Sequence, residues 1–356
     1  MAKHDLTDSR NFVNQFRYSE DNHSGNLLDN RDNDHLNNYF LNNSLLVSES
    51  ITPGIHKTLI KSLDNLKIPH DCVSTFIYSS PEIQASCQTG NDSDCIVRIS
   101  SGLIEILDED ELEFVIGHEL GHFLLKHNLS GLTHDNGLNY EKLILNRSQE
   151  VSADRVGLIA CQSLDASVRA LMKTISGLSS KYLKFNVSAF ISQIRETSKN
   201  TPKDENTTHP SMFIRCRALL WFSMSKMFHN QQSFDKDELI KLDNKIREDL
   251  DNFYDSSLRD KIKNIKDDLK LWLSLEQVIL DNAFSKEEQE IIKNNFGEKT
   301  LDKVKNFFAN FDSIKDLKIA IKNNIEESQS KLQSAIPSTF EKEIQKIFSE
   351  ITSNFK

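Results

Sequence analysis

The segment VIGHELGHFLLKH, residues 115–127, constrains this chain more than any other stretch of its sequence. Its aliphatic and aromatic residues leave almost no polar face, which is typical of a buried helix, yet His118, Glu119 and His122 lie within it. Burying two imidazoles and a carboxylate without partners costs several kcal/mol. On a helix, His118 and His122 share one face, so both imidazoles can bind the same metal ion. Glu119 is then placed to take a proton from a water on that metal, which is the HExxH arrangement of zinc sites.

A zinc site of this kind needs a third protein ligand. A longer motif with its third ligand on the same stretch requires Gly at 125 and His at 128, where the sequence has Leu125 and Asn128. His127 is out of register, and because nothing in the sequence turns it back, we expect it at the surface at the end of the helix.

Glu150 is the better third ligand. It lies in RSQEVSADRVG, one helical turn before Asp154. Glu150 would complete a His/His/Glu set with an open fourth position for water, while Asp154 would accept a hydrogen bond from the far nitrogen of a ligand histidine. Ala153 and Gly157 keep that face small, which allows the two helices to pack closely.

Composition excludes several classes of protein. A net charge of −10 argues against a general binder of nucleic acid or anionic membranes. No apolar run approaches the roughly 18–20 residues that span a bilayer, and the N-terminus shows no secretion signal. The cysteines are odd in number and form no CxxC pair, which favours a reducing cytoplasm; they are Cys72, Cys87, Cys95, Cys161 and Cys216.

Changes in residue composition and hydrophobic pattern along the chain predict three regions. Residues 1–37 are rich in Asn, Asp and Ser and are expected to form a flexible arm. Residues 38–228 contain the metal motifs and two predicted strands, 73–80 and 95–102, the second with the mixed pattern of an edge strand. Residues 229–356 read as amphipathic helices that form a separate module. The predicted fold class is α+β, with a small sheet beside the active-site helices and an all-α C-terminal module.

Three motifs occur in a fixed order: His118-Glu119-Leu120-Gly121-His122, Glu150-Val151-Ser152-Ala153-Asp154, and His209-Pro210 with Arg215 downstream. In this order they resemble the HtpX and CAAX-prenyl-protease type of zinc metallopeptidases, a gluzincin family with a zincin-like domain. The resemblance covers roughly residues 45–225. Many members are integral membrane proteins, so this chain is similar to the soluble branch.

The resemblance implies one Zn²⁺ per catalytic domain, held by His118, His122 and Glu150, with Glu119 as general base and acid. It also implies that His209 stabilises the oxyanion, that Asp154 orients a ligand, and that Arg215 supports the site from outside the ligand set. An extended protein or peptide substrate would pair with residues 95–100; the residues expected to bind it are Ile96, Val97, Arg98 and Ile99.

The sequence therefore predicts a cytoplasmic zinc-dependent endopeptidase that acts on unfolded, damaged or otherwise extended proteins, as in protein quality control. One alternative is a non-catalytic adaptor with structural zinc, which works through its helical C-terminal module and a protein partner. Intact Glu119 argues against it, because a structural site needs no base. A second alternative is a deformylase-like amide hydrolase with Cys87 or Cys95 as third ligand, but the glycine-rich and Glu-Gly-Cys segments of such enzymes are absent.

Overall fold

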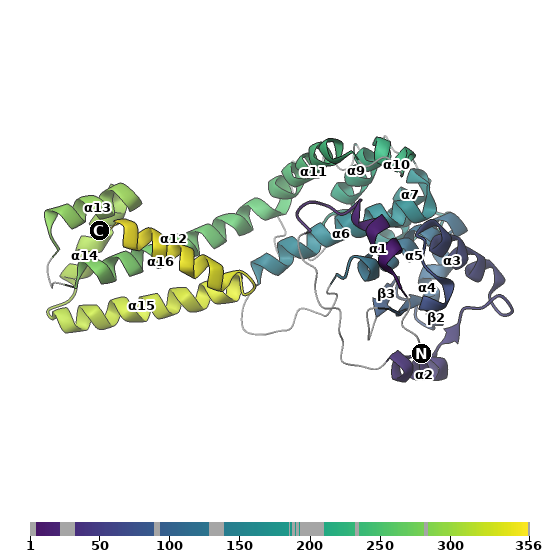
Figure 1. Ribbon diagram of the computed structural model, residues 1–356, viewed down its shortest axis with the longest axis horizontal. Coiled ribbons are helices and arrows are strands. Elements are labelled where there is room, and N and C mark those ends of the chain that lie inside the picture. The colour runs from purple at the N-terminus through teal and green to yellow at the C-terminus, as the bar shows by residue number, and fades with distance from the viewer. Residues whose placement is uncertain are drawn as a thin grey trace. The chain divides into compact units, whose positions relative to one another are not determined.

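The computed structural model describes residues 5–21, 33–88, 93–127, 139–184, 186, 189, 192, 210–231, 235–280 and 284–354. They form two compact units (Figure 1). The first comprises the described parts of 1–133 and 145–253, and the second those of 134–144 and 254–356. The predicted α+β fold class is confirmed: a small mixed sheet lies with helices around the metal motifs, and the C-terminal region is helical.

The sheet of the first unit has four strands among the described residues, in the order β1-β2-β4-β3. Their bounds are β1 Leu45–Leu46, β2 Val73–Tyr78, β3 Ala85–Gln88 and β4 Cys95–Ser100. The β2–β4 pair is parallel, and the β1–β2 and β3–β4 pairs are antiparallel. The prediction that residues 95–100 form an edge strand open to substrate is wrong, because β4 pairs along both of its sides. The edge beside it is β3.

Helix α5, Glu109–Leu124, carries the HExxH motif and packs along β3 and β4 (Figure 1). It begins with a capping box: the Asp108 side chain accepts from the backbone of Glu111, and the Glu111 side chain accepts from the backbone of Asp108. Its hydrophobic residues enter one large core. The other helices of this unit are α1 Thr7–Asn14, α2 Asn33–Asn43, α3 Pro53–Asn65, α4 Ser101–Ile106, α7 Leu164–Ser176, α9 Met212–Ser223, α10 Lys226–His229 and α11 Lys236–Leu250.

Helix α6, Tyr140–Cys161, carries Glu150, and its residues from 145 onward belong to the first unit. It meets α5 through glycines. A Cβ atom on Gly117 would lie 2.3 Å from the Cβ atom of Ala160, and one on Gly157 would lie 2.8 Å from the carbonyl oxygen of Phe114. The close approach expected from the small residues is therefore present, and it brings the two motif helices together.

The N-terminal segment differs from the flexible arm that its composition suggested. Residues 7–14 form α1, and Phe12, Val13, Phe16 and Tyr18 are buried. Phe12, Val13 and Phe16 of this segment belong to the hydrophobic core of the first unit. Residues 1–4 and 22–32 of the expected arm lie outside the described part of the chain.

Helix α11 extends the first unit beyond the boundary that we expected near residue 228. Leu239 and Leu242 belong to the first core, and Asp243 forms a buried ion pair with Arg155 of α6, at 2.6 Å. The charged residues that led us to place α11 in the C-terminal module lie on the exposed surface of this helix, whereas its buried face packs with the first unit.

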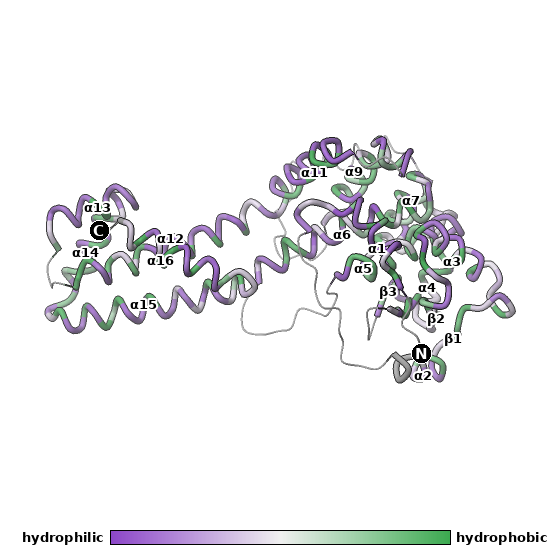
Figure 2. The backbone as a smooth tube through the Cα atoms, viewed as in Figure 1, coloured by the Kyte–Doolittle hydropathy of each residue, from purple (hydrophilic) through white to green (hydrophobic). Residues whose placement is uncertain are grey.

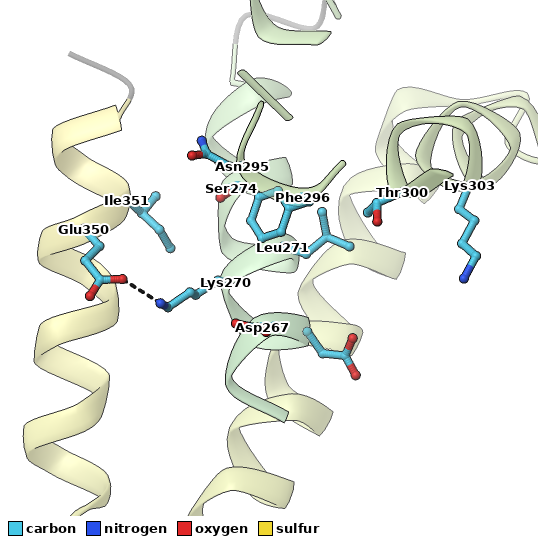
Figure 3. Close-up of a pocket in the computed structure, with 11 residues that line it drawn as sticks. Asp267, Lys270, Leu271, Ser274, Asn295, Phe296, Thr300, Lys303, Glu350 and Ile351 are labelled. Atoms are coloured by element: carbon cyan, nitrogen blue, oxygen red, sulfur yellow. Dashed lines mark ion pairs between the residues drawn. The ribbon is translucent and has the colours of Figure 1, made fainter. Parts of the chain in front are cut away.

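The second unit is built from amphipathic helices around a separate apolar core (Figure 2). They are α12 Ser256–Val278, α13 Lys286–Phe296, α14 Glu298–Ala309, α15 Ile314–Ala335 and α16 Phe340–Asn354. Ser285 and Glu288 form the capping box of α13. A mainly polar cavity of about 540 Å³ lies among α12, α13, α14 and α16, with the Lys270–Glu350 ion pair at its wall (Figure 3).

Candidate metal centre

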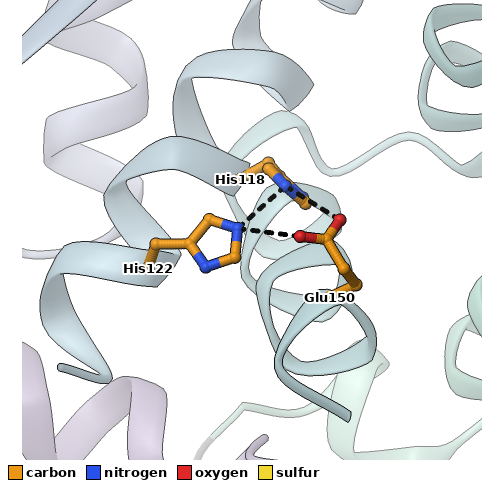
Figure 4. A group of neighbouring side chains, drawn as sticks. All are labelled: His118, His122 and Glu150. Carbon is orange, nitrogen blue, oxygen red and sulfur yellow. Dashed lines mark hydrogen bonds and ion pairs between the residues drawn. The ribbon is translucent and has the colours of Figure 1, made fainter. Parts of the chain in front are cut away.

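His118, His122 and Glu150 converge as the one described group of three His, Cys, Asp or Glu residues that could hold a metal ion (Figure 4). The two Nε2 atoms are 3.1 Å apart, and they lie 3.6 Å and 3.4 Å from the Glu150 carboxylate oxygens. Tetrahedral zinc with bonds of about 2.0–2.2 Å places its ligand atoms roughly 3.3–3.6 Å from one another. The donor set therefore fits zinc, and no fourth His, Cys, Asp or Glu joins the group among the residues that the structure describes.

Asp154 and Arg215 hold the His118 side of this group. The Nδ1 atom of His118 lies 3.0 Å from Oδ1 of Asp154, so this nitrogen carries the proton and Nε2 offers its lone pair. Arg215, on α9, donates to both Asp154 oxygens at 2.6 Å and 2.8 Å, and it lies 3.4 Å from Glu150. Arg215 thus contacts the ligand Glu150 directly and supports the ligand His118 through Asp154.

These charges determine the protonation of the buried carboxyls. Burial alone would raise the pKa of Glu150, but Arg215 and the two histidines more than offset it, and that pKa lies well below its usual value. The pKa of Asp154 is lowered by the same opposition of burial and Arg215. Burial opposes charging of His118, yet Asp154 and Glu150 raise its pKa in the metal-free protein. Both carboxyls are therefore ionised at neutral pH, as metal binding requires.

His127 and Asp21 hold the His122 side, and sequence reasoning missed both. The Nδ1 atoms of His122 and His127 are 2.8 Å apart, and Nε2 of His127 lies 2.8 Å from Oδ2 of Asp21. His127 is 0% exposed, so the expectation of a surface residue is wrong. Burial is the main reason that its pKa falls to about 4, which keeps this imidazole neutral.

A turn after α5 explains the error. Lys126 adopts a positive φ of 57°, and the backbone N–H of His127 donates to the carbonyl of His122 at 2.9 Å. The N–H of Lys126 donates to the carbonyl of Phe123, which completes a Schellman motif. Such a motif usually has glycine where Lys126 stands, so little in the sequence indicates that the chain reverses there.

The remaining predicted residues divide between those near the centre and those elsewhere. Glu119 is half-buried on α5, next to the ligands. His209 lies outside the described residues, although Pro210 is buried just before α9. Ile96, Val97, Arg98 and Ile99 lie on the interior strand β4. Cys87 and Cys95 are free and buried and do not join the ligand group found in the described chain.

The site has the HExxH arrangement of zinc metallopeptidases, with a glutamate as the third candidate ligand. Residues 50–145, which include His118, Glu119 and His122, match the model of Peptidase family M48, and Glu150 follows just beyond the matched range. The metallopeptidase resemblance inferred from the three motifs is thereby confirmed. The structure also brings together His118, His122 and Glu150, the three residues that were expected to hold zinc.

Relatives support this assignment. The chain is 27% identical over 210 residues to the plastoglobule-localized metallopeptidase 48 of Arabidopsis thaliana, a chloroplast protein, covering 51% of this chain and 60% of the relative. It is 38% identical over 79 residues to a protease HtpX homolog of Helicobacter pylori, covering 22% and 24%. It is 44% identical over 46 residues to protease HtpX of Xanthomonas euvesicatoria, covering 13% and 16%.

The chain thus spans less than two thirds of the length of these relatives. No solved structure matches it significantly. In the described residues, no helix is both long enough and apolar enough to cross a membrane.

Proposed function

We propose that the protein is a zinc-dependent endopeptidase that hydrolyses peptide bonds of extended or unfolded proteins. The observation that carries this proposal is the presence of Glu119 beside a His/His/Glu donor set with an open fourth position. A structural zinc site has four protein ligands and no general base, whereas a catalytic site has three ligands and keeps room for water.

Bound zinc would polarise the attacking water and the carbonyl of the scissile bond. Glu119 accepts the proton of that water and passes it to the leaving amine. His118, His122 and Glu150 hold the reacting centre, while Asp154 and Arg215 fix His118 in the tautomer that presents Nε2. We further propose that His209 donates to the developing oxyanion; replacing it by Ala should then lower kcat about a hundredfold or more, with zinc content unchanged.

We propose that substrate adds to the sheet at β3 rather than at β4. Residues 85–88 pair with β4 on one side and have no strand on the other among the described residues. Strand β3 packs on α5. The pKa of the Cys87 thiol is raised mainly by its hydrogen bond with Cys95 and by burial, and the nearby charge of Glu119 raises it further. An extended backbone on β3 would therefore run beside the proposed base, with little dependence on side-chain sequence. This favours unfolded or damaged proteins as substrates, and the unpaired pattern of the cysteines favours a cytoplasmic site of action.

The decisive experiment compares wild type with Glu119→Gln in the cleavage of an unfolded protein such as casein, with zinc measured in both. Glu119→Gln keeps the shape of the side chain and all three ligands, so we expect full zinc content and loss of most hydrolysis. Glu150→Ala is the matched variant that should lose zinc as well. Equal casein cleavage by wild type and Glu119→Gln would refute the proposal and favour a non-catalytic adaptor that acts through its helical unit.

A further inference from the structure

His122 is the first residue of a buried chain of hydrogen bonds that leads away from the metal centre. The chain runs from Nδ1 of His122 to Nδ1 of His127, and from Nε2 of His127 to Oδ2 of Asp21, with both distances 2.8 Å. The three side chains are buried, and Asp21 and His127 are 1% and 0% exposed. The Zn ligand is therefore connected to an acidic residue 101 positions earlier in the sequence.

The order of atoms determines where the protons lie. A carboxylate only accepts, so Nε2 of His127 carries a proton and donates to Asp21. The neutral imidazole then has its lone pair on Nδ1, where it accepts from the protonated Nδ1 of His122. Nε2 of His122 is left with a lone pair, and this atom faces His118 and Glu150. The chain of bonds thus selects the only neutral tautomer of His122 that can bind metal through Nε2.

Asp21 is held in place by the same helix that supplies Glu150. The N–H of Tyr18 donates to the Ser152 hydroxyl at 3.0 Å, and Arg155 donates to the carbonyl of Phe16 at 3.1 Å. Arg17 closes the other side through a hydrogen bond of 2.6 Å to the carbonyl of Leu125, in the turn that precedes His127. The segment 16–21 therefore bridges α6 and the end of α5.

We propose that Asp21 and His127 are positioning residues of the zinc site, which orient His122 and strengthen it as a ligand, so that the N-terminal segment is part of the metal centre. Asp154 accepts a hydrogen bond from His118 directly, whereas Asp21 acts on His122 through the imidazole of His127. The proposal rests on the zinc site and not on peptidase activity, because it concerns affinity for metal in the absence of substrate.

The first test measures the zinc dissociation constant of the full chain by chelator competition. Asp21→Asn keeps the shape of the side chain but removes its charge, and we expect zinc affinity to fall roughly tenfold to a hundredfold, the usual effect of losing such support. Glu20→Gln removes the same charge one residue earlier, from an ion pair with Arg247, and should leave affinity within about twofold of wild type. An affinity within twofold of wild type for Asp21→Asn would overturn the proposal.

A second control separates positioning from general loosening of the N-terminal segment. Asp243 anchors that segment by accepting from the N–H of Ser19 at 2.9 Å, but it does not contact His127. Asp243→Asn should lower Tm and leave zinc affinity near wild type, and an equal loss of affinity in Asp243→Asn and Asp21→Asn would contradict a specific role. Replacing His127 alone would leave the buried Asp21 carboxylate without its histidine partner, so His127→Phe is combined with Asp21→Asn. This double variant should bind zinc no more tightly than Asp21→Asn.

The tautomer gives a readout that a merely structural role would not change. In the metal-free protein with ¹⁵N-labelled histidine, wild-type His122 should be protonated at Nδ1 alone. Asp21→Asn should give a mixture of both tautomers, while Glu20→Gln should match wild type. Detection of the Nε2-protonated form as the main state of wild-type His122 would refute the proposal, whatever the outcome of the casein experiment.

Discussion

Replacing Gly117 by Ala tests whether the close contact between α5 and α6 is what builds the metal site. Gly117 immediately precedes His118, and its added Cβ would lie 2.3 Å from Cβ of Ala160 and 3.1 Å from Cα of Gly157. Carbon atoms at optimal separation are about 3.5–4.0 Å apart. The helices must therefore separate by roughly 1.2 Å or more at this level.

The same separation would act on the ligands, which come from both helices. Metal sites keep their bond lengths within about 0.2 Å, so a shift of this size moves Glu150 out of bonding range of an ion held by the two histidines. Overpacking a core costs about 1–3 kcal/mol, and the higher helix propensity of Ala returns up to about 1 kcal/mol. We expect net destabilisation of about 1–2 kcal/mol, a Tm lower by about 2–8 °C, and zinc affinity at least tenfold weaker.

Thermal unfolding of the metal-free protein and chelator competition measure the two effects separately. Gly54→Ala is the matched control, because its Cβ would meet nothing closer than a Glu109 side-chain oxygen at 4.0 Å; it should preserve zinc binding and Tm. Adding Ala160→Gly to Gly117→Ala removes the 2.3 Å contact and should restore part of both losses. Wild-type Tm and zinc affinity in Gly117→Ala would refute the reasoning that this contact sets the site.

Three further predictions concern the ligands and the unit boundary. Asp154→Asn should weaken zinc binding roughly ten- to a hundredfold by chelator competition, since its support of His118 is lost; unchanged affinity would contradict the role given to it. In the metal-free protein the raised pKa of His118 contributes stability that is fully present below pH 6.5 and is lost as pH rises through the raised value. The difference in Tm between wild type and His118→Asn should therefore shrink above pH 6.5, and a constant difference from pH 6 to 9 would argue against it. A chain ending at Phe253 should retain zinc. A chain ending at Ser225 should have a lower Tm than the chain ending at Phe253, because Arg155 is left without Asp243. Equal Tm values for the two chains would place α11 outside the first unit.

The metal ligands could be predicted because their spacing reflects helix geometry. His118 and His122, like Glu150 and Asp154, are four residues apart, and their position on a face is fixed once the segment is helical. The small face of Ala153 and Gly157 likewise predicted close helix packing from residue volume alone. These features are local, so neighbouring residues in the sequence contain the information.

The features that were missed depend on distant parts of the chain. The pairing of β4 on both sides requires the short strand β3, whose four residues carry little pattern of their own. His127 could be placed only by knowing that Lys126 takes a left-handed conformation and that Asp21 arrives beside it. The boundary after α11 depends on one buried face of a highly charged helix, and the average composition of the segment does not reveal that face.

The buried ion pair of Asp243 has a consequence for the chain during its synthesis. Asp243 joins Ser19 and Arg155, and its contact with Ser19 spans 224 positions. A chain emerging from the ribosome therefore exposes both motif helices long before the residue that secures the N-terminal segment on them is available. Since synthesis proceeds at about 5–20 residues per second, the roughly ninety residues after Glu150 delay completion by several seconds or more. We expect the N-terminal segment of the nascent chain to remain loosely held until α11 has emerged, so that the first unit reaches its full stability only when all of it has been made.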